Sequence, residues 1–247
     1  MRHRLVVCGV AVLAVAGPAR AETTTACTAM REMEQAIQGF QDEEQVTSMQ
    51  YLEGGRLVKT FEIQVVTKGA HKALVTFTAP GSMEGTRILV LDAETVYAYL
   101  PEFRRVRRIA AHALRHPFMG TNIYYEDISE RWYSARWSCS PQKTADGSLV
   151  AELLPRPGVV TAYSKLRVAV GRRPYQIERL EYFEAGRHVR TQIRERWQKV
   201  GDQERPGLIR YASQDREAEL RMEFKQWRVN TGVSDAVFTT RNLLRGQ

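Results

Sequence analysis

Residues 46–66 read VTSMQYLEGGRLVKTFEIQVV, and this stretch sets the pattern for most of the chain. Two runs of mixed apolar and polar residues flank Glu53-Gly54-Gly55, whose glycines suit a tight turn. In the second run, Phe61, Ile63 and Val65 alternate with polar residues, which is the period of a strand with one buried face. The stretch therefore predicts an antiparallel β-hairpin.

The same alternation recurs along the rest of the chain. Near its end, Leu220, Met222 and Phe224 alternate with charged residues. Further strands are predicted at residues 73–77, 88–91, 96–100, 132–139, 149–154, 163–170, 175–183, 189–200, 208–212 and 218–229. Within 189–200, one predicted face carries Val189, Thr191, Ile193 and Trp197, and the other, wet face carries Arg190, Gln192, Arg194 and Arg196.

One helix precedes these strands. Between Cys27 and Phe40 apolar residues recur every three or four positions, and Gly39 lies where a helix would stop. The pattern predicts a mainly β protein with few helices, built as a single curled antiparallel sheet, or incomplete β-barrel, of about ten or eleven strands wrapped around this helix. Because one helix cannot cover so large an apolar face, we expect an apolar cavity inside the sheet.

The first 21 residues have the features of a cleaved secretory signal. Arg2 and Arg4 form a basic start, residues 5–16 are almost entirely apolar, and Ala19-Arg20-Ala21 is a small-x-small cleavage motif. The apolar run is too short to cross about 30 Å of hydrocarbon as a helix. We therefore predict a soluble, exported chain, residues 22–247, that forms a single domain.

Export bears on the cysteines and on the charge. Cys27 and Cys139 remain in the mature chain, and an even pair in an oxidising compartment favours a disulfide, which we prefer to two separate buried thiols. The net charge falls from +8 to +5, because Arg2, Arg4 and Arg20 are removed and no acid is. Such a surface suits anionic partners such as phospholipid headgroups, although many proteins without such partners share it.

Few residues point to catalysis. His112 and His116 have a spacing that could hold a metal on a helix, but Pro117 follows at once, so we interpret them as surface histidines. Glu126 and Asp127 are adjacent and would point to opposite faces of a strand, so a turn or helix cap explains them better than an acid–base pair. We predict no enzyme, no catalytic residue, no cofactor and no metal site.

Two charged features stay open to more than one interpretation. Glu195, on the face of Ile193 and Trp197, either meets a buried arginine or reaches the mouth of a cavity. The strip formed by Arg104, Arg105, Arg107 and Arg108 either docks on phosphates or acidic side chains of a partner, or protects the edge of a sheet against association. Export makes nucleic acid a poor partner for this strip.

Four motifs in the centre of the chain carry a family resemblance. They are PGSMEGTRILVL at 80–91, VYAYLP at 96–101, RRVRRI at 104–109 and FMGTNIYYED at 118–127. In this order they resemble the periplasmic outer membrane lipoprotein-sorting proteins of the LolA-like superfamily. The sequence departs from the family pattern at Glu84, where lysine is usual, and at Asn122, where aspartate is usual, so no precise role is assigned to either residue.

The resemblance implies an incomplete barrel closed by helices, which holds acyl chains of a lipid or lipoprotein and passes them between membranes. It also implies an inner-membrane partner of the resistance-nodulation-division (RND) type, and we expect a monomer. An accessory subunit that docks on such an exporter without binding cargo is the alternative; a hydrolase is the least favoured. The family offers no catalytic residues to transfer.

The alternation selects a set of residues for the wall of the predicted cavity. Each of them could equally be ordinary core, and the prediction depends on the set leaving a gap. The set comprises Phe61, Ile63, Val75, Phe77, Leu89, Tyr97, Ile193, Trp197, Met222 and Phe224.

Overall fold

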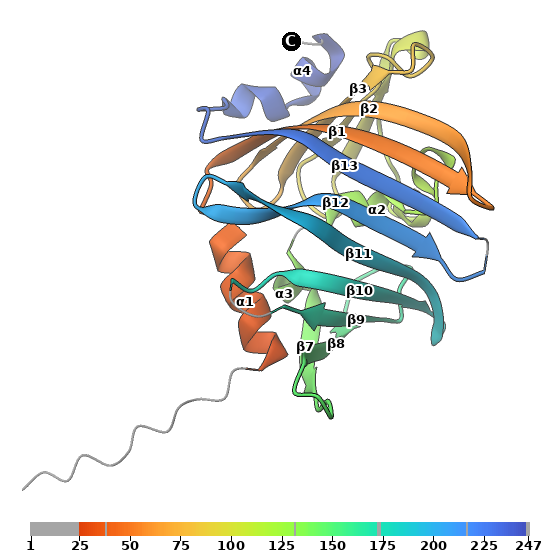
Figure 1. The fold of residues 1–247 in the computed structure, drawn as a ribbon. Coiled ribbons are helices and arrows are strands. Elements are labelled where there is room, and N and C mark those ends of the chain that lie inside the picture. Colours follow the sequence, from red (N-terminus) through yellow and green to blue (C-terminus); the bar gives the residue numbers. More distant parts are fainter. Residues whose placement is uncertain (1–24, 38, 131, 172–173, 216, 246–247) are drawn as a thin grey trace, which may run out of the picture.

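A computed structural model describes residues 25–37, 39–130, 132–171, 174–215 and 217–245. The predicted signal, residues 1–21, lies outside this range. The described strands form one antiparallel sheet of thirteen, in the order β6-β5-β4-β3-β2-β1-β13-β12-β11-β10-β9-β8-β7 (Figure 1). The sheet is strongly curved, and β6 and β7 are its two open edges. The predicted fold class is thus confirmed.

Two meanders meet at the seam between β1 and β13. The first consists of β1 (Asp42–Glu53), β2 (Arg56–Lys68), β3 (Lys72–Ala79), β4 (Arg87–Val90), β5 (Val96–Leu100) and β6 (Arg105–Arg108). The second consists of β7 (Trp137–Gln142), β8 (Leu149–Pro155), β9 (Lys165–Val170), β10 (Ile177–Glu184), β11 (Arg187–Val200), β12 (Gln203–Ser213) and β13 (Ala218–Val229). The predicted hairpin is β1–β2, and both glycines of its turn have positive φ.

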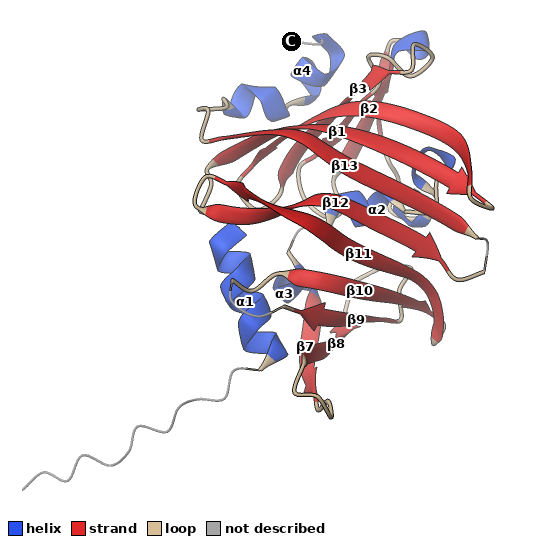
Figure 2. Cartoon of the chain, viewed as in Figure 1, coloured by secondary structure: helices blue, strands red, loops and turns tan. Residues whose placement is uncertain are grey.

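The helices are short and lie around the sheet (Figure 2). They are α1 (Ala26–Ile37), α2 (Tyr125–Ser129), α3 (Tyr133–Arg136) and α4 (Thr240–Arg245), with 3-10 turns η1 (Pro101–Phe103), η2 (Ala113–Arg115), η3 (Phe118–Gly120) and η4 (Asp235–Phe238). None of the helices in the described part of the chain has the length and apolar character needed to traverse a bilayer.

Three details differ from the prediction. The sheet has thirteen strands rather than ten or eleven, and the alternation missed β6 because three of its four residues are arginines. Residues 133–136 form α3 instead of the start of a strand. The sheet does not wrap around α1, which packs on β7, β8 and β9 at one end of it.

The inner face of the sheet carries two apolar clusters. One joins β1–β5 and β12–β13 to buried residues of the segment after β6, including Phe118 and Ile123. The other packs α1, through Ala29, Met30 and Met33, on β8–β10. A third cluster, on the outer face, is covered by η4 and α4 through Phe238 and Leu243.

Candidate functional site

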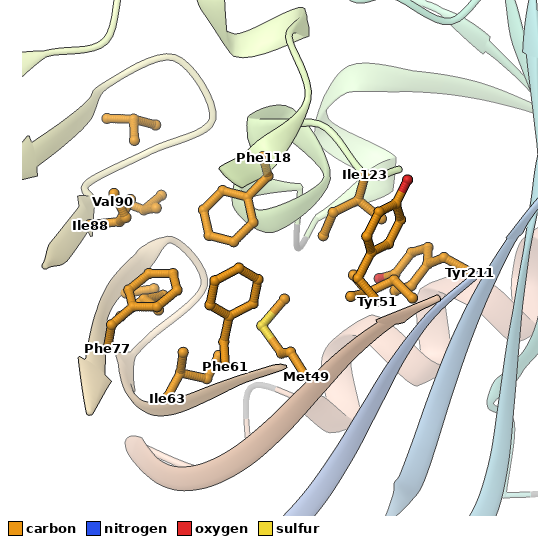
Figure 3. Packing of buried hydrophobic residues seen from close by; sticks show 14 of the residues in the cluster. Met49, Tyr51, Phe61, Ile63, Phe77, Ile88, Val90, Phe118, Ile123 and Tyr211 are labelled. Atoms are coloured by element: carbon orange, nitrogen blue, oxygen red, sulfur yellow. The ribbon is translucent and has the colours of Figure 1, made fainter. Parts of the chain in front are cut away.

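The inner face beside β1–β4 is covered by residues 109–130, which connect β6 towards β7 and are called here the cover segment. Its Phe118 and Ile123 are each 1% exposed. The Phe118 ring faces Phe61 and Phe77 on the sheet, and Ile123 lies beside Tyr51 (Figure 3). The rings of Phe77 and Phe118 are 6.0 Å apart, centroid to centroid. The cover segment therefore fills much of the space that the sequence predicted to be empty.

An apolar cavity of about 230 Å³ remains between the cover segment and the sheet. Ile123 and Ile128 form its cover-segment side, and Ile209 and Met49 belong to its sheet side. Of the predicted wall residues, the cavity is lined by Ile63, Val75, Met222 and Phe224. Small-molecule pockets typically have ~300–1,000 Å³, so this cavity is smaller than a typical ligand pocket.

The other predicted wall residues lie elsewhere. Phe61 and Phe77 are packed core beside the cavity, with their rings 5.6 Å apart. Leu89 and Tyr97 belong to the cluster on the outer face, and Ile193 and Trp197 are half-buried on β11 without lining the cavity. Lipid binding by the ten residues stays a prediction.

A buried arginine on β11 joins the cover segment to the second meander. The Arg190 guanidinium donates to the Asp127 carboxylate at 2.6 Å, to the Asn122 carbonyl and to the Tyr163 hydroxyl. Its carbon Cζ lies 4.3 Å from the centroid of the Tyr182 ring. These residues, with Arg190 at the centre, are called the polar hub.

The polar hub contains a fully desolvated ion pair, since the side chains of Arg190 and Asp127 are 4% and 3% exposed. Burial lowers the pKa of Arg190, but Asp127, Tyr163 and Tyr182 outweigh burial and raise it above its ordinary value. Burial raises the pKa of Tyr163 and Tyr182 well above the ordinary range. Arg190 therefore stays charged and the tyrosines neutral at physiological pH, which keeps every donor in the hub available.

The prediction that Arg190 and Gln192 lie on a wet face of β11 is wrong. Arg190 and Gln192 are each 3% exposed and face the interior, where Gln192 donates to the Tyr211 hydroxyl at 2.6 Å. The alternation was read correctly, but its polar side points inward, because partners from the cover segment, from Tyr163 just before β9, and from β10 and β12 satisfy these groups. The FMGTNIYYED motif, which supplies Asn122 and Asp127, was the available signal for a buried cationic partner.

The adjacent carboxylates have structural roles. Asp127 accepts a hydrogen bond from the Tyr124 amide at 2.6 Å at the start of α2, so the predicted helix cap is confirmed. Glu126 accepts from the Ala162 amide at 3.0 Å. Glu130, near the end of the cover segment, pairs with Arg136 at 3.0 Å, yet burial raises its pKa to about 7.

The structure also locates the cysteine pair, Glu195 and the two histidines. Cys27 and Cys139 form the predicted disulfide, which ties α1 to β7. Glu195 makes a two-point ion pair with Arg210, both bonds being 2.9 Å long, on a partly exposed surface. His112 and His116 are exposed, with rings 6.1 Å apart.

The arginine strip lies at a free edge of the sheet. Arg105, Arg107 and Arg108 are exposed on β6, and Arg104 precedes it with a φ of 47°. Phe103, next to the strip, is 57% exposed. The strip thus lies on an edge strand, and both protection of that edge and docking stay predictions.

The chain matches a protein-family model over most of its length. A protein-family model, described as that of an uncharacterized protein, matches residues 69–245. The chain belongs to that family. Among curated proteins, none matches the sequence.

Several solved structures share the fold of this chain. A candidate outer membrane lipoprotein-sorting protein domain from Vibrio parahaemolyticus is 20% identical with a TM-score of 0.79, covering 88% of this chain and 97% of its own. A DUF1329 family protein from Desulfovibrio piger is 21% identical with a TM-score of 0.79, covering 90% and 100%. A LolA superfamily protein from Nitrosomonas europaea is 16% identical with a TM-score of 0.73, covering 88% and 98%. The predicted LolA-like resemblance is confirmed in the fold.

Proposed function

We propose that the protein is a periplasmic carrier that shields acyl chains of a lipid or lipoprotein in the cavity between the cover segment and the sheet. One observation supports this most: the apolar cavity is bounded on one side by a segment that no covalent cross-link ties to the sheet. Covering acyl carbons contributes about 0.8 kcal/mol per CH₂, so such a wall can bind a chain without specific polar contacts.

Uptake of a whole acyl chain requires the cover segment to move. The side chains of Phe118 and Ile123 already occupy the space next to the cavity. If they withdraw, Phe61 and Phe77 become part of the cavity wall. Six of the ten predicted residues then surround the guest: Phe61, Ile63, Val75, Phe77, Met222 and Phe224. The role is binding, since nothing in the proposal calls for a reacting group.

The test uses two neighbouring residues on opposite faces of β13. Met222 lines the cavity and is half-buried, whereas Glu223 is exposed on the other face. Met222→Trp should reduce uptake of a fluorescent fatty acid at least fivefold, because the indole fills the cavity, and Glu223→Trp should leave it unchanged. Native mass spectrometry should find lipid on the wild type. A wild type that never takes up lipid, or two variants that behave alike, would reject the proposal.

A second candidate function draws on the arginine strip. Four arginines with no ion-pair partner in the described ranges, beside the exposed Phe103, suit an anionic surface or an acidic partner such as an inner-membrane exporter of the RND type. Arg105→Glu with Arg107→Glu should abolish partner capture while fatty-acid uptake stays unchanged. If capture persists, the strip only protects the edge of the sheet.

A further inference from the structure

A second, polar cavity opens beside the apolar one. It has a volume of about 300 Å³, and its lining is mostly polar. The charged residues in that lining are Arg115, Glu184, Arg187, Arg190 and Asp215. They come from the cover segment, from the β10–β11 hairpin, and from the turn after β12.

The two cavities are neighbours on the same face of the sheet. On β1, Met49 lines the apolar cavity and Tyr51 lines the polar one. On β12, Tyr211 lines the apolar cavity and Ser213 lines the polar one. Residues two apart on a strand share a face and lie about 7 Å from each other. The polar cavity is therefore the continuation of the apolar one along the strands.

The cover segment and the polar hub separate the two cavities. Consecutive residues Asn122 and Ile123 line the polar and the apolar cavity respectively. The ion pair also bridges the boundary, because Arg190 belongs to the polar lining and Asp127 to the apolar one. A movement of the cover segment that admits an acyl chain would thus join the cavities into one space with an apolar and a charged end.

The charges of the polar cavity are of both signs and largely unpaired. The side chains of Arg115, Arg187 and Asp215 have no hydrogen bond or ion pair to the described part of the chain, whereas Glu184 accepts from the Tyr124 hydroxyl at 2.9 Å. The Asn122 side-chain oxygen is buried and has no hydrogen-bond partner among the residues that the structure describes. Guanidinium groups suit a phosphate, and carboxylates beside them would repel a purely anionic ligand while favouring one that also carries an ammonium group.

We propose that the polar cavity binds the phosphate and ammonium of a zwitterionic lipid headgroup, with phosphate on Arg115 and Arg187 and ammonium on Glu184 and Asp215, while the acyl chains of the same lipid occupy the apolar cavity. The inference rests on the proposed carrier function and names its substrate class. The glycerol backbone of the lipid would cross the boundary at Asn122.

The experiment measures which lipid the full-length mature protein extracts. Vesicles with equal amounts of dioleoyl phosphatidylethanolamine, phosphatidylglycerol and diacylglycerol are incubated with protein, and the bound lipid is quantified by mass spectrometry. We expect phosphatidylethanolamine to exceed diacylglycerol at least tenfold. Arg115→Ser with Arg187→Ser should bring this ratio close to one, and Glu184→Gln with Asp215→Asn should shift the preference towards phosphatidylglycerol.

Controls separate the outcomes. Lys199→Ser with Arg241→Ser removes the same charge from exposed positions outside both cavities and should keep the wild-type ratio. A wild type that binds all three lipids equally would overturn the headgroup site and leave the carrier function standing. A wild type that binds none would overturn the carrier function itself. Soluble glycerophosphoethanolamine should compete better than inorganic phosphate, and equal competition would overturn the ammonium half of the assignment.

Discussion

Two segments cover the inner face of the sheet, and they are held in different ways. Helix α1 lies on β7–β9 through small and apolar side chains such as Ala29 and Met33, and the Cys27–Cys139 disulfide attaches it covalently. The cover segment lies on the first meander through Phe118 and Ile123, and the polar hub provides its ion-pair link to the second meander.

The difference indicates which cover is the more firmly attached. A disulfide and close apolar packing hold α1 in a single place. A buried ion pair has strong attraction offset by a large desolvation cost, so its net contribution is small even though the loss of one partner is severe. Release of the cover segment would also expose Phe118 and Ile123, at about 1.5–3 kcal/mol for each side chain, so it requires a guest that replaces these apolar contacts as well as new partners for the polar groups.

The largest expected effect follows from removing one partner of the hub. Asp127→Ala should lower the free energy of unfolding by about 3–5 kcal/mol, because it leaves the Arg190 charge buried without an acid. Urea denaturation measures the change. The exposed pair offers a matched control, since Glu195→Ala, which leaves Arg210 in water, should cost at most about 1 kcal/mol. Equal effects at the two pairs would contradict the special role of the hub.

Removing the disulfide should be the next largest change. The bond closes a loop with a sequence separation of 112 residues, so Cys27→Ser with Cys139→Ser should cost about 4 kcal/mol. Hydrogen exchange should then show early loss of protection in α1 and no change in the cover segment. Reductant should reproduce the effect in the wild type and leave the double variant unaffected; early exchange in both covers would remove the distinction between them.

Protonation of Glu130 sharpens the comparison further. Burial raises its pKa from 4.5 to about 7 in the folded state, so the folded state binds more protons than the unfolded state between these values. The contribution of Glu130 to the free energy of unfolding is fully present below about pH 4.5 and is lost as the pH rises through 7. The whole contribution is on the order of 3 kcal/mol. Glu130→Gln should flatten the pH dependence of unfolding between pH 5 and 8.

Glu94 serves as the control for that measurement. Its carboxylate also pairs with Arg136, at 3.4 Å, but the side chain is 65% exposed. Glu94→Gln should therefore keep the wild-type slope of stability against pH. A Glu130→Gln variant with the same slope as the wild type would show that burial of this carboxyl does not couple the cover segment to pH.

The smallest expected effect concerns the open edge. Arg105→Ser with Arg107→Ser on β6 should change the free energy of unfolding by less than about 0.5 kcal/mol, because both side chains are exposed. The double variant should however associate at high concentration, which light scattering would detect, since charge on an edge strand opposes sheet-to-sheet pairing. A variant that stays monomeric would leave docking as the better interpretation of the strip.

Alternation along the chain predicted most strands and their faces, because burial of one face imposes a period of two wherever the partner layer is apolar. It predicted correctly that Phe61, Ile63, Met222 and Phe224 lie on the inner face of the sheet. It failed for β11, where Arg190 and Gln192 face inward towards polar partners distant in sequence. Residue type alone cannot reveal that such partners will meet.

The candidate site was predicted only in part, because the segment that covers it has no regular apolar period. The expected gap exists, but the sequence treated residues 109–130 as connection, and short turns such as η2 and η3 have no long apolar period to announce them. Their buried residues, Leu114 and Phe118, fill the concavity that the sheet alone would leave open. The separation of inner from outer face also escaped prediction for Leu89 and Tyr97, because η4 and α4 make the outer face apolar there.

The pairing of β1 with β13 bears on how the chain acquires its structure. Each meander consists of neighbouring hairpins that can form from local contacts, whereas the seam joins the first strand to the last, as in the pair Tyr51 and Leu220. Closing such a distant contact is slow, and β1 presents an unpaired edge until the final strand has arrived. A chain that crosses a membrane unfolded would thus complete its sheet only after the last segment is through, and a chain shortened at the C-terminus should aggregate instead of forming a smaller sheet.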